Sequence, residues 1–262
     1  MTRELTDNVA VITGGSRGIG RAIARALAEQ GCDCLLVART ESDLLETAQQ
    51  ISSDTGSRVE ICATDLRTEA GCAEVLAAAK ETFGRVSILV NNAGDTKGGP
   101  FLELDDEVWQ AGFDLKFWSA VRLSRLLWPM LKESKGTVIN IDGGFARTPS
   151  PDVLIGGAVN AALANFTKGL AGVGLQDDVN VNAVHPGPTL TERMTNMFET
   201  RGTQAGITAE EFKQRLIDKQ GVRRLGEPED VAELVAFLCS PRARHIQGVS
   251  IAVDGGGTQG LF

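Results

Sequence analysis

The chain contains no tyrosine, and among its 262 residues there are only two histidines and five cysteines. The number of cysteines is odd, none forms a Cys-x-x-Cys pair, and His185 and His245 lie far apart in the sequence. Structural zinc sites are built from such pairs, and stable disulfides belong to oxidising compartments. The sequence therefore predicts no metal site and a reduced, cytoplasmic setting.

Positive charge is also scarce, since 26 lysines and arginines stand against 34 acidic residues and give a net charge of −8. Nucleic acids and anionic membranes bind clustered positive charge, so neither is expected as a partner. No apolar run approaches the roughly 20 residues that a membrane helix needs, and the first residues carry no apolar stretch of the signal-peptide type. We therefore expect a small molecule as the partner.

Short apolar, β-branched runs alternate with longer segments that have apolar residues at helical spacing. The expected strands cover residues 9–13, 34–38, 59–63, 87–91, 137–141, 179–184 and 249–253, and the expected helices cover 21–30, 44–55, 70–83, 109–132, 160–175 and 228–238. This alternation predicts an α/β fold in which crossover helices join parallel strands. A chain of this length fits one core, so residues 1–262 are expected to form a single domain.

Residues 188–226 interrupt the alternation, because they are polar, contain a helical pattern at 209–220 and add no strand. In an open parallel sheet the ligand lies beyond the carboxyl ends of the strands. Since this segment follows the strand expected at 179–184, we predict that it covers a substrate. The alternative is an idle surface insertion. Met194, Met197, Phe198 and Phe212 favour an apolar ligand, unless they only seat the segment on the domain.

A glycine-rich turn, Thr13-Gly14-Gly15-Ser16-Arg17-Gly18-Ile19-Gly20, lies between the first expected strand and the first expected helix. Glycine allows a tight turn and lets a pyrophosphate approach the backbone N–H groups, while the helix N-terminus supplies positive potential. The turn therefore predicts dinucleotide binding.

The turn and five later motifs together resemble the short-chain dehydrogenases/reductases over nearly the whole chain. The later motifs are Thr64-Asp65-Leu66, Asn91-Asn92-Ala93-Gly94, Val184-His185-Pro186-Gly187 with Thr191, residues 224–232, and Val253-Asp254-Gly255-Gly256. The resemblance implies a Rossmann-type, doubly wound parallel sheet of about seven strands and a homotetramer or homodimer. It also implies a cofactor site made by Gly14, Ser16, Arg17, Gly18, Ile19, Gly20, Arg39, Asp65, Leu66, Asn92, Ala93, Gly94, Pro186, Gly187, Thr189 and Thr191.

The end of the second expected strand indicates which nicotinamide cofactor binds. An acidic residue there holds the ribose 2′-hydroxyl of NAD and repels the 2′-phosphate of NADP. Here the strand ends Val37-Ala38-Arg39, without an acid, and Arg17 supplies a second cation in the glycine turn. NADP(H) is therefore favoured over NAD(H), unless both arginines are only solvated surface groups.

The family's usual catalytic residues are an Asn, a Ser, a Tyr and a Lys, and the resemblance implies that all four are replaced here. Aligned on the strand at 137–141 and the helix that follows it, these positions hold Asp114, Gly143, Gly156 and Asn160. No shift of the alignment restores a Tyr that the chain does not contain. The sequence thus predicts a divergent member with a degenerate active site.

Three side chains are candidates for the missing proton transfer. Asp142 precedes the usual Ser position, Asp114 occupies the usual Asn position, and His185 stands before the Pro-Gly segment that borders the nicotinamide in the family. An imidazole titrates near neutral pH, so His185 is the leading candidate. The alternative is that His185 only bonds the backbone at a strand end and that Asp114 only packs within its helix.

Three functions remain open. The chain is an oxidoreductase with a non-standard site that acts on a carbonyl or alcohol, a catalytically inactive nucleotide-binding sensor or partner subunit, or a lyase or isomerase that reuses the pocket. The cofactor motifs favour the first two functions, whereas the replaced residues favour the last two.

Overall fold

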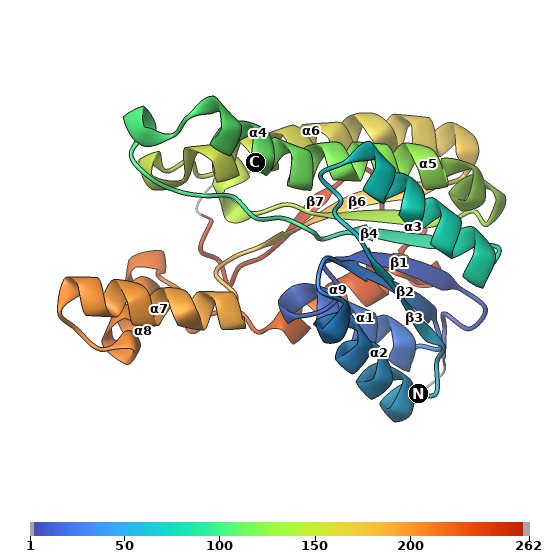
Figure 1. The fold of residues 1–262 in the computed structure, drawn as a ribbon, viewed down its shortest axis with the longest axis horizontal. Helices are drawn as coiled ribbons and strands as arrows, with labels where there is room; N and C mark the ends of the chain where they lie inside the picture. Colours follow the sequence, from blue (N-terminus) through green and yellow to red (C-terminus); the bar gives the residue numbers. More distant parts are fainter. Residues whose placement is uncertain (1–2, 259–262) are drawn as a thin grey trace.

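The computed structural model describes residues 3–258, and a single seven-stranded parallel sheet forms its centre (Figure 1). The strand order is β3-β2-β1-β4-β5-β6-β7, so the chain reverses its direction of travel across the sheet between β1 and β4. The strands are β1 (Val9–Thr13), β2 (Asp33–Ala38), β3 (Val59–Ala63), β4 (Ile88–Asn91), β5 (Thr137–Ile141), β6 (Asn180–Pro186) and β7 (Ser250–Val253). The predicted single-domain Rossmann fold is confirmed.

Helices cover both faces of the sheet, as Figure 1 shows. One face carries α1 (Gly18–Glu29), α2 (Glu41–Thr55) and α9 (Pro228–Cys239). The other face carries α3 (Glu69–Thr82), α5 (Ser119–Glu133) and α6 (Leu154–Asp177), with α4 (Asp106–Phe113) leading into α5.

The two layers have separate apolar cores because side chains alternate along each strand. Ala10 and Ile12 of β1 pack with α1, α2 and α9, whereas Val11 between them packs with α3 and α5. Burial on both faces explains why the strands read as continuous apolar runs.

Two expected helices differ from the observed ones in a way that affects the site. The helix expected at 109–132 is instead α4 and α5 joined by a π-helical turn, Asp114–Trp118. The helix expected at 160–175 begins earlier, at Leu154, so both Gly156 and Asn160 lie inside it and are buried. A π turn shifts the helical register by one residue, a change that the spacing of apolar residues does not reveal.

The segment after β6 contains two helices, α7 (Glu192–Ala205) and α8 (Ala209–Gln220), which project from the body of the molecule (Figure 1). The sequence predicted only the second. Both are N-capped by threonine, and Thr208 forms a full capping box with Glu211 that fixes the start of α8. Because α7 is mostly polar, the spacing of its apolar residues did not predict a helix.

Within residues 3–258, no helix has the length and apolar character needed to cross a membrane. Across the same residues, no three His, Cys, Asp or Glu side chains gather in a way that could hold a metal ion.

Candidate functional site

The glycine turn is tied to the carboxyl end of β4, at the point where the strand order reverses. The Thr13 hydroxyl accepts hydrogen bonds from the backbone N–H groups of Asn92 and Ala93, each at 2.9 Å. The Asn92 amide donates back to the carbonyl oxygens of Thr13 at 2.9 Å and Gly14 at 3.3 Å. These bonds join two segments about 80 residues apart, at the place where ligands bind in sheets of this kind.

The turn fits a dinucleotide because its glycines have no room for side chains. Gly14 and Gly18 have positive φ angles of 65° and 55°, and a Cβ added to Gly20 would lie 2.1 Å from the Gly14 carbonyl oxygen. No side chain caps the start of α1, and its first turn holds no acidic residue. The first N–H groups of α1 are therefore left for an anion such as a pyrophosphate.

Cations surround the turn where the sequence predicted them. Arg17 and Arg39 are exposed, and neither forms an ion pair within residues 3–258. A hollow of about 150 Å³ beside the turn is lined by Arg17, Arg21 and Arg25 together with the start of α7. Hydrogen bonds from Arg67 hold the pKa of Asp65 below its usual range, and the charge of Arg39 contributes to the same effect. Arg39 and Asp65 follow the ends of β2 and β3, which pair at Ala38 and Ala63.

The predicted nicotinamide end of the site is also assembled at the strand ends. Gly187 donates its N–H to the Val253 carbonyl at 3.0 Å, and the Thr189 hydroxyl donates to the Gly187 carbonyl at 2.9 Å. Thr191 caps α7, and its Cγ2 would lie 3.2 Å from a Cβ on Gly18. The segment that begins at Thr191 therefore starts against the glycine turn.

Asn160 and Gly143, at two positions that the sequence predicted to replace catalytic residues, lie against one another. A Cβ added to Gly143 would lie 2.8 Å from Nδ2 of Asn160, whose side chain is buried. A Cβ on Gly156 would lie 3.1 Å from the Thr96 hydroxyl, which belongs to the loop after β4. The side chains of Asn160 and Thr96 thus occupy the space beside the two glycines.

The structure brings Asp142 and His185 together beneath these positions. Nδ1 of His185 lies 3.3 Å from Oδ1 of Asp142, both side chains are fully buried, and the Ser250 hydroxyl donates to Oδ2 of Asp142 at 3.1 Å. Neither imidazole nitrogen forms a hydrogen bond within residues 3–258. A buried imidazole does not touch a substrate in this conformation, and it does not bond the backbone either.

Asp114 does not join this cluster. Its carboxylate accepts a hydrogen bond from the side chain of Gln110, one helical turn earlier, at 2.9 Å. The side chain that reaches the cluster from this helix is Lys116, two residues further on. Its Nζ donates to the Asp142 carbonyl at 3.1 Å, and its Cδ would lie 2.9 Å from a Cβ on Gly94.

Lys116 is the functional candidate that the sequence reading missed. Burial disfavours its charged form and lowers its pKa to about 8, although the negative charge of Asp142 opposes this shift and the positive charge of Arg193 adds to it. The signal was present in Leu115-Lys116-Phe117-Trp118, where one charge stands among large apolar residues. The π turn that aims it inward was not predictable.

An ion pair joins the start of α7 to the loop after β4. Arg193 of α7 lies 3.1 Å from Asp95 in the loop after β4, and both side chains are largely exposed. Phe198 and Phe212 pack on each other with ring centroids 6.2 Å apart, so these two rings hold α7 against α8. This contact lies within the segment, so both the seating role and the ligand-lining role stay predictions.

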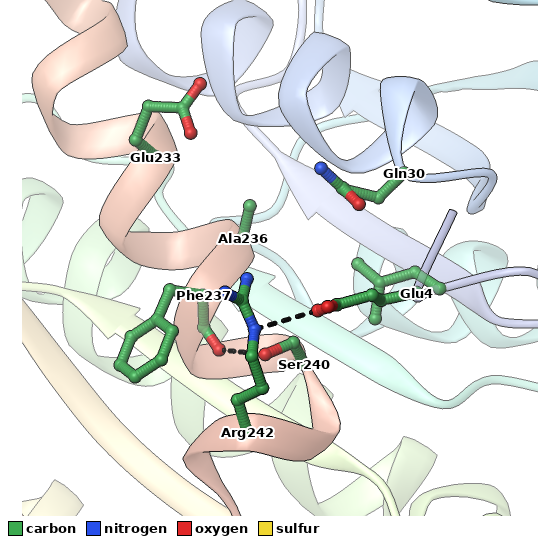
Figure 2. Close-up of a pocket in the computed structure, with 8 residues that line it drawn as sticks. Glu4, Gln30, Glu233, Ala236, Phe237, Ser240 and Arg242 are labelled. Carbon is green, nitrogen blue, oxygen red and sulfur yellow. Dashed lines mark hydrogen bonds and ion pairs between the residues drawn. The ribbon is translucent and has the colours of Figure 1, made fainter. Parts of the chain in front are cut away.

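A second cavity, of about 170 Å³, lies at the opposite edge of the sheet (Figure 2). Gln30 follows the end of α1, and Arg242 pairs with Glu4 at 2.9 Å. Because helices run antiparallel to the strands here, the end of α1 marks the amino edge of the sheet. This cavity is therefore not part of the cofactor site.

The parallel sheet and the uncapped glycine turn define a dinucleotide-binding protein of the Rossmann class. The family model described as enoyl-(acyl carrier protein) reductase matches residues 14–258. The chain belongs to the short-chain dehydrogenases/reductases, a family of oxidoreductases, as its motifs predicted.

Known relatives cover the full length of the chain. An uncharacterised oxidoreductase of Bacillus subtilis is 32% identical over 100% of both chains. The 3-oxoacyl-(acyl-carrier-protein) reductase of Vibrio cholerae is 34% identical over 96% of this chain and 98% of its own length. The crystal structure of L-sorbose reductase from Gluconobacter frateurii, complexed with NADPH and L-sorbose, has a TM-score of 0.96 at 35% identity and full coverage of both chains.

The contact between positions 143 and 160 predicts a compensating pair. Gly143→Ser is expected to lower the free energy of unfolding by about 1–3 kcal/mol, because its Cβ would overlap the Asn160 amide. Adding Asn160→Ala is expected to recover most of this loss. Denaturant unfolding measures both changes. Gly169→Ser, on an open face of α6, is the matched control, and an unchanged stability of Gly143→Ser would contradict the predicted contact.

The lowered pKa of Lys116 predicts a pH-dependent stability. An unfolded lysine titrates near 10.4, so between about pH 8 and 10.4 the unfolded chain binds more protons at this residue than the folded chain. Stability contributed by this group therefore rises with pH across that window. Relative to Lys116→Met, the wild type is expected to gain about 1–3 kcal/mol between pH 7 and 10. Denaturant midpoints measure this difference, and exposed Lys80→Met should show none.

Proposed function

We propose that this protein is an NADP(H)-dependent oxidoreductase that interconverts a carbonyl and an alcohol through a non-standard active site. The observation that carries the proposal is the uncapped glycine turn with Arg17 beside it and Arg39 at the end of β2. The sorbose reductase structure is a complex with NADPH and L-sorbose, which supports the same cofactor and a hydroxylated carbonyl compound as substrate.

Each part of the cofactor has matching residues in this chain. The N–H groups at the start of α1 would hold the pyrophosphate, Arg17 and Arg39 the 2′-phosphate, and Asp65 with Leu66 the adenine. Gly94, Pro186 and Gly187 would border the nicotinamide. When bound, NADPH supplies the hydride. The chain itself orients the carbonyl compound at the ends of β4 and β5 and excludes water with α7.

The Asp142–His185 pair is proposed to act from below the site rather than on the substrate. Both side chains are buried, and Asp142 contacts Lys116 through its carbonyl oxygen. The negative charge of the Asp142 carboxylate favours the charged form of Lys116, and the Ser250 hydroxyl holds this carboxylate in place. Asp114 is given no role in the chemistry, because its carboxylate is bonded to Gln110.

A nucleotide-binding sensor without catalysis is the second candidate. The observation that favours it is the filling of the usual catalytic positions by Asn160 and Thr96. This candidate shares the cofactor site of the first and differs in lacking turnover.

A homodimer or homotetramer is proposed for either candidate function. Phe101, Leu102 and Leu175 are large apolar side chains with exposed fractions of 63%, 93% and 73%.

Calorimetric titration with NADPH and NADH tests the cofactor assignment. Arg39→Ala is expected to weaken NADPH binding about tenfold or more, because a charge-assisted bond to the 2′-phosphate is lost. NADH binding should be unchanged. Arg85→Ala, which removes an exposed arginine at the amino edge of the sheet, is the matched control. Equal affinities for NADPH and NADH in the wild type would overturn the NADP(H) assignment, and an absence of binding would overturn both candidate functions.

Turnover separates the two candidates. NADPH oxidation in the presence of L-sorbose, followed by absorbance, is the first assay. Oxidation that depends on the ketose supports the oxidoreductase. NADPH binding without oxidation, with L-sorbose and with a panel of ketones and aldehydes, would favour the sensor.

A further inference from the structure

Lys116 is a cation at the carboxyl ends of β4 and β5. Its Nζ bonds the Asp142 carbonyl, and its stem lies against Gly94. The residue is only partly exposed at this edge of the sheet. An ammonium at this edge stands next to the nicotinamide end of the proposed cofactor site.

A purely structural role explains this lysine poorly. Holding an ammonium in a mostly buried place costs free energy, and a neutral amide could donate to the same carbonyl. The helix also departs from α geometry through the π turn Asp114–Trp118, with Lys116 at its centre. Such turns disrupt helical hydrogen bonding and are frequent at functional sites.

The charges around Lys116 come from each element that packs against it. Asp142 at the end of β5 supplies the negative charge. Its carboxylate accepts a hydrogen bond from Ser250 of β7 and lies 3.3 Å from Nδ1 of His185 of β6. Arg193 of α7 supplies a positive charge and is paired with Asp95 after β4. On its own helix, Asp114 is bonded to Gln110.

We propose that Lys116 is the catalytic acid and base of this protein, and that it replaces from a different helix the proton-transferring side chain that the chain lacks. The proposal rests on the proposed oxidoreductase function. In reduction, the carbonyl carbon accepts the hydride that NADPH supplies, and the carbonyl oxygen takes a proton from the Lys116 ammonium. The N–H bond breaks, an O–H bond forms, and the lysine becomes a neutral amine that regains its proton from water. Oxidation of the alcohol runs in reverse.

The pKa of about 8 suits this task, because both forms of the amine are then present near neutral pH. An ordinary lysine is almost entirely protonated there and is a weak acid. Asp142 is a positioning residue in this scheme, since it fixes Nζ and keeps enough of the ammonium charged to donate.

The position of Lys116 beside the nicotinamide can be tested without a substrate. NADP⁺ carries a positive charge on its ring that NADPH lacks, and the two share all phosphates. A charged Lys116 should therefore disfavour NADP⁺, and its deprotonation should remove that repulsion. The ratio of NADP⁺ to NADPH affinity, measured by calorimetry, is expected to rise about tenfold from pH 7 to pH 9 in the wild type.

Three variants make this result specific. Lys116→Met has no charge and Lys116→Arg has a permanent one, so in both the ratio should be independent of pH. Lys80→Met, at an exposed lysine of α3, should behave as the wild type. A pH-independent ratio in the wild type overturns the Lys116 proposal alone, as does an unchanged pH dependence in Lys116→Met. If neither nucleotide binds, the proposed function fails as well.

Turnover gives the second readout. With L-sorbose or another carbonyl compound that the wild type reduces, Lys116→Met is expected to lower kcat about 100-fold or more, while its NADPH affinity at pH 9 stays within about twofold. A kcat near the wild-type value would overturn the proposal.

Competitive acylation of the lysines against pH, read by mass spectrometry, should place the Lys116 amine near its lowered pKa, and an ordinary lysine titration would count equally against the proposal.

Discussion

The parallel direction of all seven strands is the constraint on which the rest of this structure depends. Because every strand ends at the same edge, residues that are far apart in the sequence meet there. Thr13, Asn92, Asp142 and His185 follow or end different strands and lie at this one edge. The Thr13 hydroxyl then fixes the glycine turn to β4 through two backbone N–H groups. Cofactor and chemistry are thereby confined to one side of the sheet.

The charged and polar side chains that meet at the carboxyl edge of the sheet come from different helices and strands. Lys116 comes from the α4–α5 helix, Asp142 from the end of β5, His185 from β6 and Ser250 from β7. A buried charge is tolerated when a partner and hydrogen bonds offset its desolvation. Here Lys116 donates to the Asp142 backbone carbonyl, and the nearby Asp142 carboxylate, which accepts from Ser250, supplies the opposite charge.

At positions that the sequence aligned with the family's catalytic residues, neighbouring side chains fill the space beside glycines. Gly143 has no side chain, and Asn160 occupies the adjoining space. Gly156 admits Thr96 from the loop after β4 in the same way. Both glycines are therefore closely packed against neighbouring side chains, as protein interiors require. The α4–α5 helix brings a charged group, Lys116, to the same edge of the sheet.

The sequence by itself determined the α/β fold, the strand segments, the glycine turn and the cations beside it, because all of these follow from local periodicity and short motifs. It also determined that no Tyr is available. Only the tertiary structure decided that Asp114 turns away, that Lys116 reaches Asp142, and that His185 is buried. The physical reason is that one π turn rotates a helix face without leaving a mark in the apolar pattern. Burial and pairing of charge likewise depend on neighbours that are distant in the sequence.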